Sequence, residues 1–187
     1  MKAFSNLLSD LILTSSRNRK LSLISEYFRA TPDPDRGFAL GALTGSLNFK
    51  NIKASFFKEL IKEKQDAYLF DLSYDYVGDL AETVSLLWDQ KKEGNMPGLS
   101  FLFESLTKAT NEDLKSNIID ILDMSTADQR WAFIKLFTGG LRIGVSSRLV
   151  KQALANYGNV DLEEIEKIWH GLHLPYINLF SWLEKKG

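Results

Sequence analysis

The chain has 187 residues, enough for one globular domain or two small ones, and 44% of them are hydrophobic, which excludes a disordered chain. It contains no cysteine, so disulfide frameworks, thiol nucleophiles and cysteine-ligated zinc sites are excluded. Its formal net charge is -1, which argues against a protein that is basic throughout but does not describe how the charges are arranged.

Apolar residues at i, i+3, i+4 and i+7, the spacing of an amphipathic helix, recur along nearly the whole chain. In chain order this spacing predicts helices over residues 4–12, 21–28, 38–43, 54–64, 69–76, 78–88, 99–108, 111–124, 127–137, 146–157, 161–170 and 176–183. Hydroxyls at 14–16 and at Thr126 are placed to cap the helices that follow them, and segments 31–35 and 91–98 read as connections. No segment alternates like a strand, so we predict an all-α fold, a compact bundle of about ten to twelve short helices.

The start of the chain does not look like a targeting segment. Asp10 lies inside the first apolar stretch, whereas a secretory signal has an uncharged apolar core. No apolar run approaches the ~20 residues of a membrane-spanning helix. We therefore expect a cytoplasmic protein with no membrane association.

Two segments of the chain resemble each other. Residues 38–47 align with residues 132–141, because each ends an apolar helix, continues as Thr-Gly-x-Leu and leads into a basic helix. The alignment predicts an internal pseudo-twofold repeat of helix–turn–helix hairpins, with halves of roughly 1–90 and 99–187. Glycine often ends a helix for backbone reasons alone, so the similarity also fits two unrelated helix C-caps.

Charge is segregated along the chain in step with this repeat. Residues 36–58 and 129–160 carry basic side chains and no acid, whereas residues 65–90 carry acids and no Lys or Arg. The near-zero total is therefore a sum of blocks, and both Thr-Gly hairpins lie in the basic ones. We expect the acidic block to face away from a polyanionic ligand.

A glycine turn that leads into a basic helix suits phosphate binding. Glycine allows close approach of a ligand, and the free N–H groups of a helix N-terminus point at an anion. Hydroxyl and cationic side chains add donors here, namely Thr44, Ser46, Lys50, Thr138, Arg142, Ser146, Ser147, Arg148 and Lys151. A third candidate is segment 14–20, where hydroxyls and Asn18 precede a helix with three cations. That segment fits equally an N-cap beside exposed basic residues.

Signals for catalysis are weak. No Walker A sequence occurs, and the glycine-rich segment 139–144 follows a predicted helix, whereas a dinucleotide fingerprint follows a strand. His170 and His173 are three residues apart, but no carboxylate partner accompanies them. Four acids at roughly helical spacing raise a metal or paired-carboxylate site as an alternative to helix caps on a solvated face: Asp71, Asp75, Asp79 and Glu82.

Three motifs stand out: Thr14-Ser-Ser-Arg17-x-x-Lys20, Val77-Gly-Asp-Leu-Ala-Glu82 and Phe137-Thr-Gly-Gly-Leu-Arg-Ile-Gly-Val-Ser146. Together they resemble the N-terminal DNA-binding domain of bacterial-type ATP-dependent DNA ligases. The similarity extends over essentially the whole chain, so residues 1–187 are expected to form a single helical DNA-binding domain. The third motif is the most specific part.

The resemblance implies a domain that binds nicked duplex DNA on its minor-groove side, through backbone phosphates and without reading sequence. Carried over position by position, it implies contacts at Arg17, Asn18, Lys20, Thr44, Gly45, Ser46, Asn48, Thr138, Gly139, Gly140, Arg142, Gly144, Ser146 and Arg148. Asn48 stands where the second copy has Arg142, which weakens the first hairpin as a phosphate site.

The resemblance also implies a division of labour. The nucleotidyltransferase and oligonucleotide-binding-fold domains of a complete ligase are absent, and so is an adenylation lysine motif, so this chain alone is expected to be non-catalytic. ATP and Mg²⁺ are implied for the complete ligase in DNA repair, replication or recombination. The expected partners are nicked double-stranded DNA, with the protein nucleoid-associated when bound, and the missing catalytic domains. The alternative is a helical protein–protein adaptor that uses its acidic face.

Overall fold

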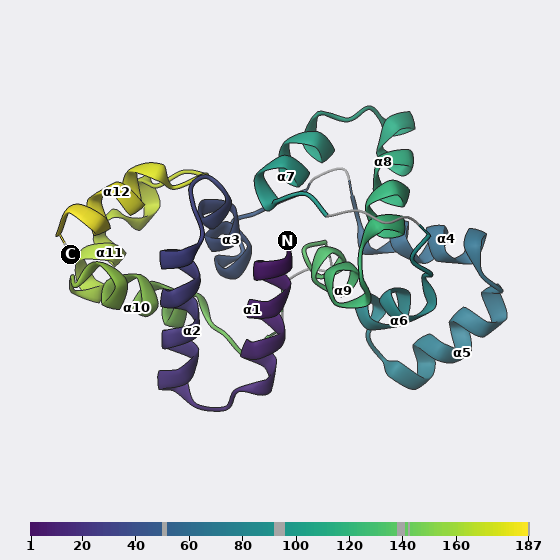
Figure 1. Cartoon of the computed structure of the whole chain (residues 1–187), viewed down its shortest axis with the longest axis horizontal. Coiled ribbons are helices and arrows are strands. Elements are labelled where there is room, and N and C mark those ends of the chain that lie inside the picture. The colour runs from purple at the N-terminus through teal and green to yellow at the C-terminus, as the bar shows by residue number, and fades with distance from the viewer. Residues whose placement is uncertain (50–51, 92–95, 138–140, 142, 187) are drawn as a thin grey trace. The chain divides into compact units, whose positions relative to one another are not determined.

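A computed structural model describes residues 1–49, 52–91, 96–137, 141 and 143–186 (Figure 1). These residues form α-helices and one 3-10 helix, and no strand occurs among them, so the all-α prediction is confirmed. The helices are α1 (Lys2–Leu13), α2 (Arg17–Ala30), α3 (Asp35–Thr44), α4 (Ala54–Lys64), α5 (Ala67–Val77), α6 (Leu80–Leu87), α7 (Leu99–Lys108), α8 (Asn111–Met124), α9 (Ala127–Lys135), α10 (Ser147–Gly158), α11 (Leu162–Ile168), η1 (Trp169–Gly171) and α12 (Ile177–Lys186). None of the helices in the described ranges is long and apolar enough to cross a membrane.

Capping side chains at the N-terminus define where many of these helices begin. Ser16, Thr110, Thr126 and Ser146 each accept a hydrogen bond from the backbone N–H three residues later, which satisfies one amide of the first turn. The cap explains why α2 begins at Arg17, ahead of the first apolar residue of its stripe. Helix α5 likewise begins at Ala67 because the Asp66 carboxylate accepts from the N–H groups of Tyr68 and Leu69.

The helices divide into two compact units, each assembled from two stretches of chain. Unit 1 comprises Met1–Ser5 and Asn48–Leu141, and unit 2 comprises Asn6–Leu47 and Arg142–Gly187. This division differs from the halves 1–90 and 99–187 that the repeat suggested, because α10 of the second half packs against α2 and α3 of the first. The internal repeat stays a prediction.

Unit 1 is built around aromatic side chains. Helix α6 packs against α9, α5 and α4. The Phe137 ring lies 4.4 Å from the Phe49 ring and 5.3 Å from the Phe57 ring, measured between centroids. Phe133 and Phe103 extend the cluster at similar distances. These ring contacts bury large apolar area and give unit 1 its core.

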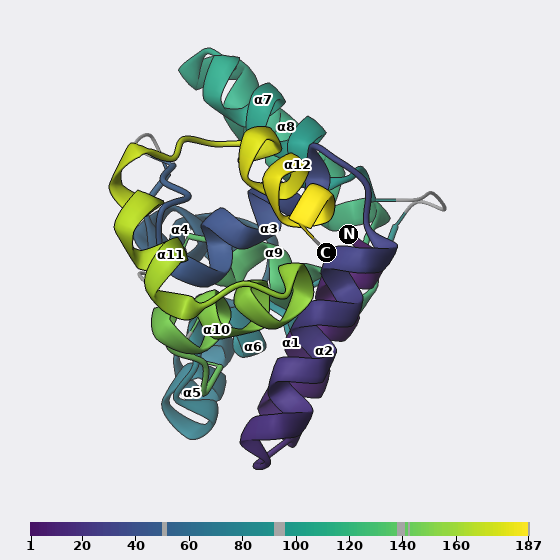
Figure 2. The same ribbon diagram turned by 90° about the vertical axis from the view of Figure 1, so that its left-hand side faces the viewer.

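Unit 2 is centred on α10, which packs against α2, α3, α11 and α12 (Figure 2). The Phe28 ring of α2 meets the Phe180 ring of α12 edge to face, with centroids 5.2 Å apart. Helix α3 approaches the chain near Pro175 so closely that a Cβ on Gly37 would lie 1.6 Å from the Pro175 carbonyl oxygen. Only glycine fits at this position, because any side chain would displace the backbone.

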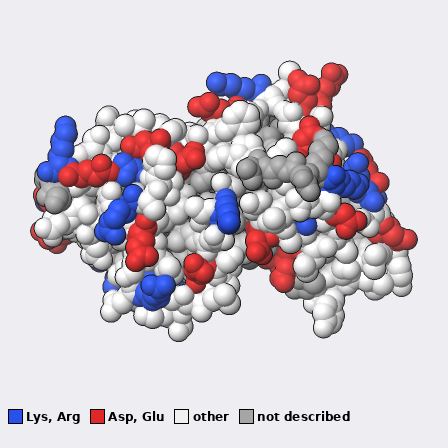
Figure 3. Space-filling view, viewed as in Figure 1, with Lys and Arg blue, Asp and Glu red and all other residues white. Residues whose placement is uncertain are grey.

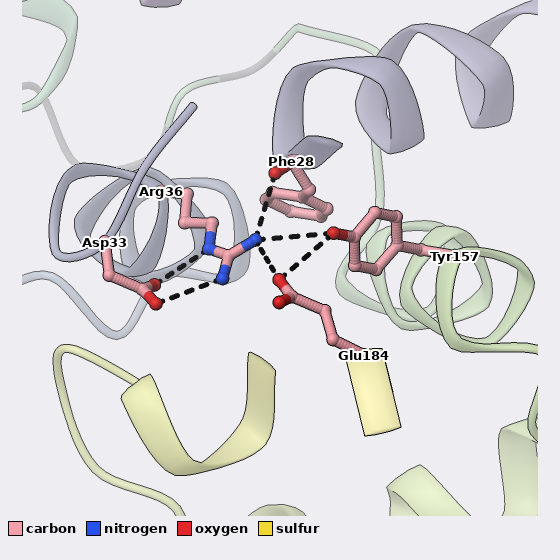
Figure 4. A network of polar contacts seen from close by, with 5 residues as sticks. All are labelled: Phe28, Asp33, Arg36, Tyr157 and Glu184. Atoms are coloured by element: carbon pink, nitrogen blue, oxygen red, sulfur yellow. Dashed lines mark hydrogen bonds and ion pairs between the residues drawn. The ribbon is translucent and has the colours of Figure 1, made fainter. Parts of the chain in front are cut away.

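A buried guanidinium ties together three parts of unit 2 (Figure 4). Arg36 of α3 donates to both carboxylate oxygens of Asp33 and to the Phe28 carbonyl, and it pairs with Glu184 of α12 at 2.5 Å. Its guanidinium also lies 4.2 Å from the centre of the Phe180 ring. Burial alone would lower the pKa of Arg36, but Asp33 and Glu184 outweigh it and raise the pKa, so the group stays charged.

Two cations are buried in unit 1. Arg130 donates to the Ser125 carbonyl at 2.6 Å and twice to the Ser85 carbonyl. Burial lowers the pKa of Arg130, and the nearby Asp89 and Asp123 partly offset this. Lys135 forms an ion pair with Asp79 at 2.7 Å. Burial alone would raise the pKa of Asp79, but Lys135 and the Glu82 N–H lower it below 3.8.

The buried cations reduce the positive charge that the two acid-free segments present to solvent. Arg36, Arg130 and Lys135 belong to the two acid-free segments, and each is less than a tenth exposed. They therefore hold the core together and are not offered to a ligand. The surface charge of the basic segments is carried by fewer side chains than the sequence count indicates.

Candidate nucleic-acid interface

The N-terminus of α2 is an open donor site. Ser16 accepts from the Arg19 N–H at 3.3 Å, and the first turn contains no acid. The N–H groups of Arg17 and Asn18 have no acceptor within the helix, because the first amides of any helix lack one. The side chains of Arg17, Asn18 and Arg19 are exposed. Two amides, the positive end of the helix dipole and two guanidinium groups therefore face solvent together.

The N-terminus of α10 has the same construction. The Ser146 hydroxyl accepts from the Leu149 N–H at 3.1 Å, and again no acid lies in the first turn. The amides of Ser147 and Arg148 lack an acceptor within the helix. The Arg148 side chain is exposed and that of Ser147 is half-buried.

One hydrogen bond joins the two sites. The Lys20 ammonium of α2 donates to the Gly144 carbonyl, in the loop before α10, at 2.8 Å. Further along the two helices the Ser25 hydroxyl donates to the Ala153 carbonyl. The bond places the first turn of α2 beside the loop that leads into α10. The motif at 14–20 and the end of the third motif, from Gly144 to Ser146, therefore come together within unit 2.

Gly144 fits this junction for two reasons. Its backbone has φ +73°, a left-handed conformation that costs an L-amino acid about 1–2 kcal/mol relative to glycine. A Cβ at this position would also lie 3.2 Å from the Lys20 ammonium nitrogen. The glycine therefore permits both the turn and the lysine contact.

The Thr44-Gly45-Ser46 hairpin is a helix C-cap in the structure. Gly45 has φ +79°, and the N–H groups of Ser46 and Leu47 donate to the Gly41 carbonyl at 2.8 and 3.0 Å. The Thr44 hydroxyl donates to the Leu40 carbonyl at 2.8 Å, and Ser46 accepts from the Tyr176 hydroxyl at 3.0 Å. These hydroxyls already serve the fold, and they do not lie at the start of a helix.

Lys151 faces α11. Its ammonium pairs with Glu166 at 3.2 Å and lies 4.8 Å from the centre of the Trp169 ring, with the side chain 13% exposed. Asn48 is exposed and belongs to unit 1. Five further candidates lie outside the described residues: Lys50, Thr138, Gly139, Gly140 and Arg142.

The structure adds a groove that the sequence reading missed. It has a volume of about 390 Å³ and lies between α2 and α10, lined by Asn18, Leu21, Ser22, Ser25, Glu26, Arg29, Asn156 and Tyr157. The signal was present in the sequence, because Asn18, Ser22, Ser25 and Arg29 follow helical spacing beside the apolar stripe. Which helix lies opposite this stripe is not a local property, so the groove could not be predicted.

Two of the acids considered for catalysis make structural contacts, and both histidines are exposed. Of the four acids considered, Asp79 caps α6 and pairs with Lys135, and Asp71 pairs with Lys62. Asp75 and Glu82 are exposed on α5 and α6. His170 lies in η1 and His173 follows it, both exposed. Within the described ranges, no group of three or more His, Asp or Glu side chains is placed to hold a metal ion.

The chain is similar to a known protein family over most of its length. The sequence model of the family described as DNA ligase N terminus matches residues 1–155. A search of curated proteins finds no significant match. The matched range includes both helix N-termini and every candidate contact residue, up to Lys151.

Proposed function

Because the chain belongs to the DNA ligase N-terminal family, we propose that it binds nicked duplex DNA as the DNA-binding part of an ATP-dependent DNA ligase. The observation that carries the proposal is the Lys20–Gly144 hydrogen bond. It brings together two helix N-termini whose free amides and exposed guanidinium groups match the oxygens of backbone phosphates.

The chemistry of these contacts supports binding without sequence preference. Backbone amides and arginines at a helix N-terminus contact phosphates, which are the same for every base pair. Two such sites in one unit engage separated phosphates and so fix the orientation of the duplex. We propose that contact is made from the minor-groove side, on both sides of the nick.

In the complete enzyme the chemistry belongs to other domains. ATP and Mg²⁺ would supply adenylate transfer and charge neutralisation there when they are bound. The role of this chain in repair, replication or recombination is to hold the nick in place. We place the protein in the cytoplasm, at the nucleoid when it is bound to DNA.

The test is binding to a nicked duplex across a series of salt concentrations. The slope of log affinity against log salt is negative, and removing one phosphate contact makes it shallower by about 0.9. We expect Arg148→Ala to weaken binding at least about tenfold, as for loss of one charge-assisted hydrogen bond, and to make the salt dependence shallower by about 1 in the slope. Arg142→Ala, at the most specific motif, is expected to act in the same direction.

The matched control is Lys185→Ala. Lys185 is also an exposed cation, but it adjoins Glu184, whose partner Tyr157 lies at the C-terminal end of α10. We expect this change to leave the slope unaltered. Equal effects of Arg148→Ala and Lys185→Ala, or a flat salt response of the unmodified chain, would overturn the assignment of the α2 and α10 N-termini.

A further inference from the structure

Unit 1 exposes a cluster of large apolar side chains on α5 and α6. Leu72, Tyr76 and Leu86 are 50%, 93% and 63% exposed, and Tyr68 and Leu69 adjoin them. Six residues line a groove of about 320 Å³ between the two helices: Leu72, Ser73, Tyr76, Thr83, Leu86 and Leu87. We call this the α5/α6 groove. Apolar side chains clustered in this way on a surface are typical of an interaction site.

The groove is not an unpacked side of the core. Phe70 is buried and Tyr74 half-buried on another face of α5, where the ammonium groups of Lys62 and Lys58 lie over their rings. On α6, Leu80, Ala81 and Val84 are buried, and the helix packs against α9. Both helices therefore have their apolar partners already, and the groove residues form an additional apolar face.

The charged side chains that α5 and α6 themselves carry have one sign, and Lys58 and Lys62 lie over rings on another face of α5. Segment 65–90 contains no Lys or Arg, and Asp75 and Glu82 are exposed on α5 and α6. Two other acids of this segment pair with lysines from neighbouring helices. Lys62 of α4 pairs with Asp71 at 3.7 Å, and Lys135 of α9 pairs with Asp79. In Figure 3 the surface at the position of α5 in Figure 1 is mostly white, with red side chains at its edges.

We propose that the α5/α6 groove binds an amphipathic helix of a partner protein, with Leu-type residues at i, i+3 or i+4 and i+7 and Lys or Arg on its flanks. Helix α5 has 11 residues and is therefore about 16 Å long, enough to accommodate about three turns of a partner helix. The apolar positions of the partner would fill the groove and its cations would meet Asp75 and Glu82.

The same charges disfavour other occupants. Nucleic acid and anionic membranes would place their phosphates against carboxylates. A second copy bound by twofold symmetry would set this acidic border against itself, because a twofold interface uses the same patch on both subunits. A basic amphipathic helix satisfies both the apolar surface and the charge.

The test uses a labelled 18-residue helical peptide with Leu at the stated positions and Lys on its flanks, and fluorescence anisotropy with the full chain. Two control peptides carry the same residues in scrambled order, and Glu in place of Lys. We expect the Leu/Lys peptide to bind at least tenfold more tightly than either control. Equal binding of the scrambled peptide would reveal non-specific charge attraction and would overturn the proposal.

Variants of the chain locate the site. Leu86→Ser should weaken peptide binding at least tenfold, whereas Leu13→Ser, at a side chain 85% exposed in unit 2, should leave it unchanged. Asp75→Asn with Glu82→Gln should weaken it severalfold, and Asp10→Asn should not. Circular dichroism of each variant verifies folding, which these exposed positions are not expected to disturb.

Two outcomes would reassign the groove. Concentration-dependent dimerisation in sedimentation that is lost in Leu86→Ser would identify a second copy as the occupant. Weaker binding of nicked duplex DNA by Leu86→Ser than by Leu13→Ser would place nucleic acid on this face. Either result contradicts the proposal, and neither depends on whether the α2 and α10 N-termini bind DNA.

Discussion

At the scale of single residues, the candidate interface depends on one hydrogen bond between a lysine and a glycine that are distant in sequence. Lys20 reaches the Gly144 carbonyl, and Gly144 adopts φ +73° beside it. Both residues belong to motifs predicted to contact DNA, but nothing in those motifs relates one residue to the other. Their contact supports a further role for both, as the junction that sets two helix N-termini side by side.

Gly144→Ala is expected to lower the free energy of unfolding by about 1–2 kcal/mol, because a Cβ disfavours the left-handed backbone and crowds the Lys20 ammonium. Urea denaturation followed by circular dichroism measures the change. The control is Gly171→Ala, where a Cβ would meet nothing within 4 Å and φ is not left-handed. We expect the control to stay within about 0.5 kcal/mol of the unmodified chain, and equal losses in both variants would contradict this explanation.

At the scale of elements, ion pairs made by buried cations connect separate helices. Lys135 of the second basic segment pairs with Asp79 at the start of α6, so the cation stabilises the contact between α9 and α6. Arg36 does the same between α3 and α12. The acid-free stretches thus supply cations both to the core and to the surface.

Asp79→Asn isolates this pair, because asparagine keeps an oxygen acceptor for the Glu82 N–H but removes the charge opposite Lys135. We expect the free energy of unfolding at pH 7 to fall by about 1–3 kcal/mol. The folded pKa of Asp79 lies below its usual value of 3.8, so its stabilising contribution is present above that pH and is lost as the pH falls through the folded value. The stability difference between variant and unmodified chain should therefore shrink below about pH 4.

Asp75→Asn is the matched control for that measurement, since Asp75 is an exposed carboxylate on the neighbouring helix α5. Its removal should change stability at pH 7 by no more than about 0.5 kcal/mol. An Asp79→Asn variant whose stability deficit is the same at pH 7 and at pH 3 would show that the ion pair is not the cause.

At the scale of the whole molecule, the chain builds two units from interleaved segments. Unit 1 runs continuously from Asn48 to Leu141 and adds Met1–Ser5, whereas unit 2 needs both ends of the chain. Repeated sequence patterns in 38–47 and 132–141 suggested consecutive halves, but the packing of α10 on α2 and α3 assigns the first hairpin to the same unit as the C-terminal helices.

A fragment of residues 48–141 is therefore expected to fold with a cooperative thermal transition, because it holds nearly all of unit 1. A fragment of residues 1–90 should lack such a transition, since its α2 and α3 are separated from α10. Circular dichroism during heating distinguishes the two. Cooperative unfolding of fragment 1–90 would favour autonomous halves and would contradict the division found here.

Local sequence features are sufficient to predict the helices, several of their ends and the family resemblance. The bounds of α4, α7 and α8 agree with the predicted ranges, because apolar spacing and capping side chains act within a few residues. Three features follow from tertiary packing alone: which helices pack together, the burial of Arg36, Arg130 and Lys135, and the contact between Lys20 and Gly144. These features arise from contacts between residues far apart in the chain, and local periodicity carries no information about such partners.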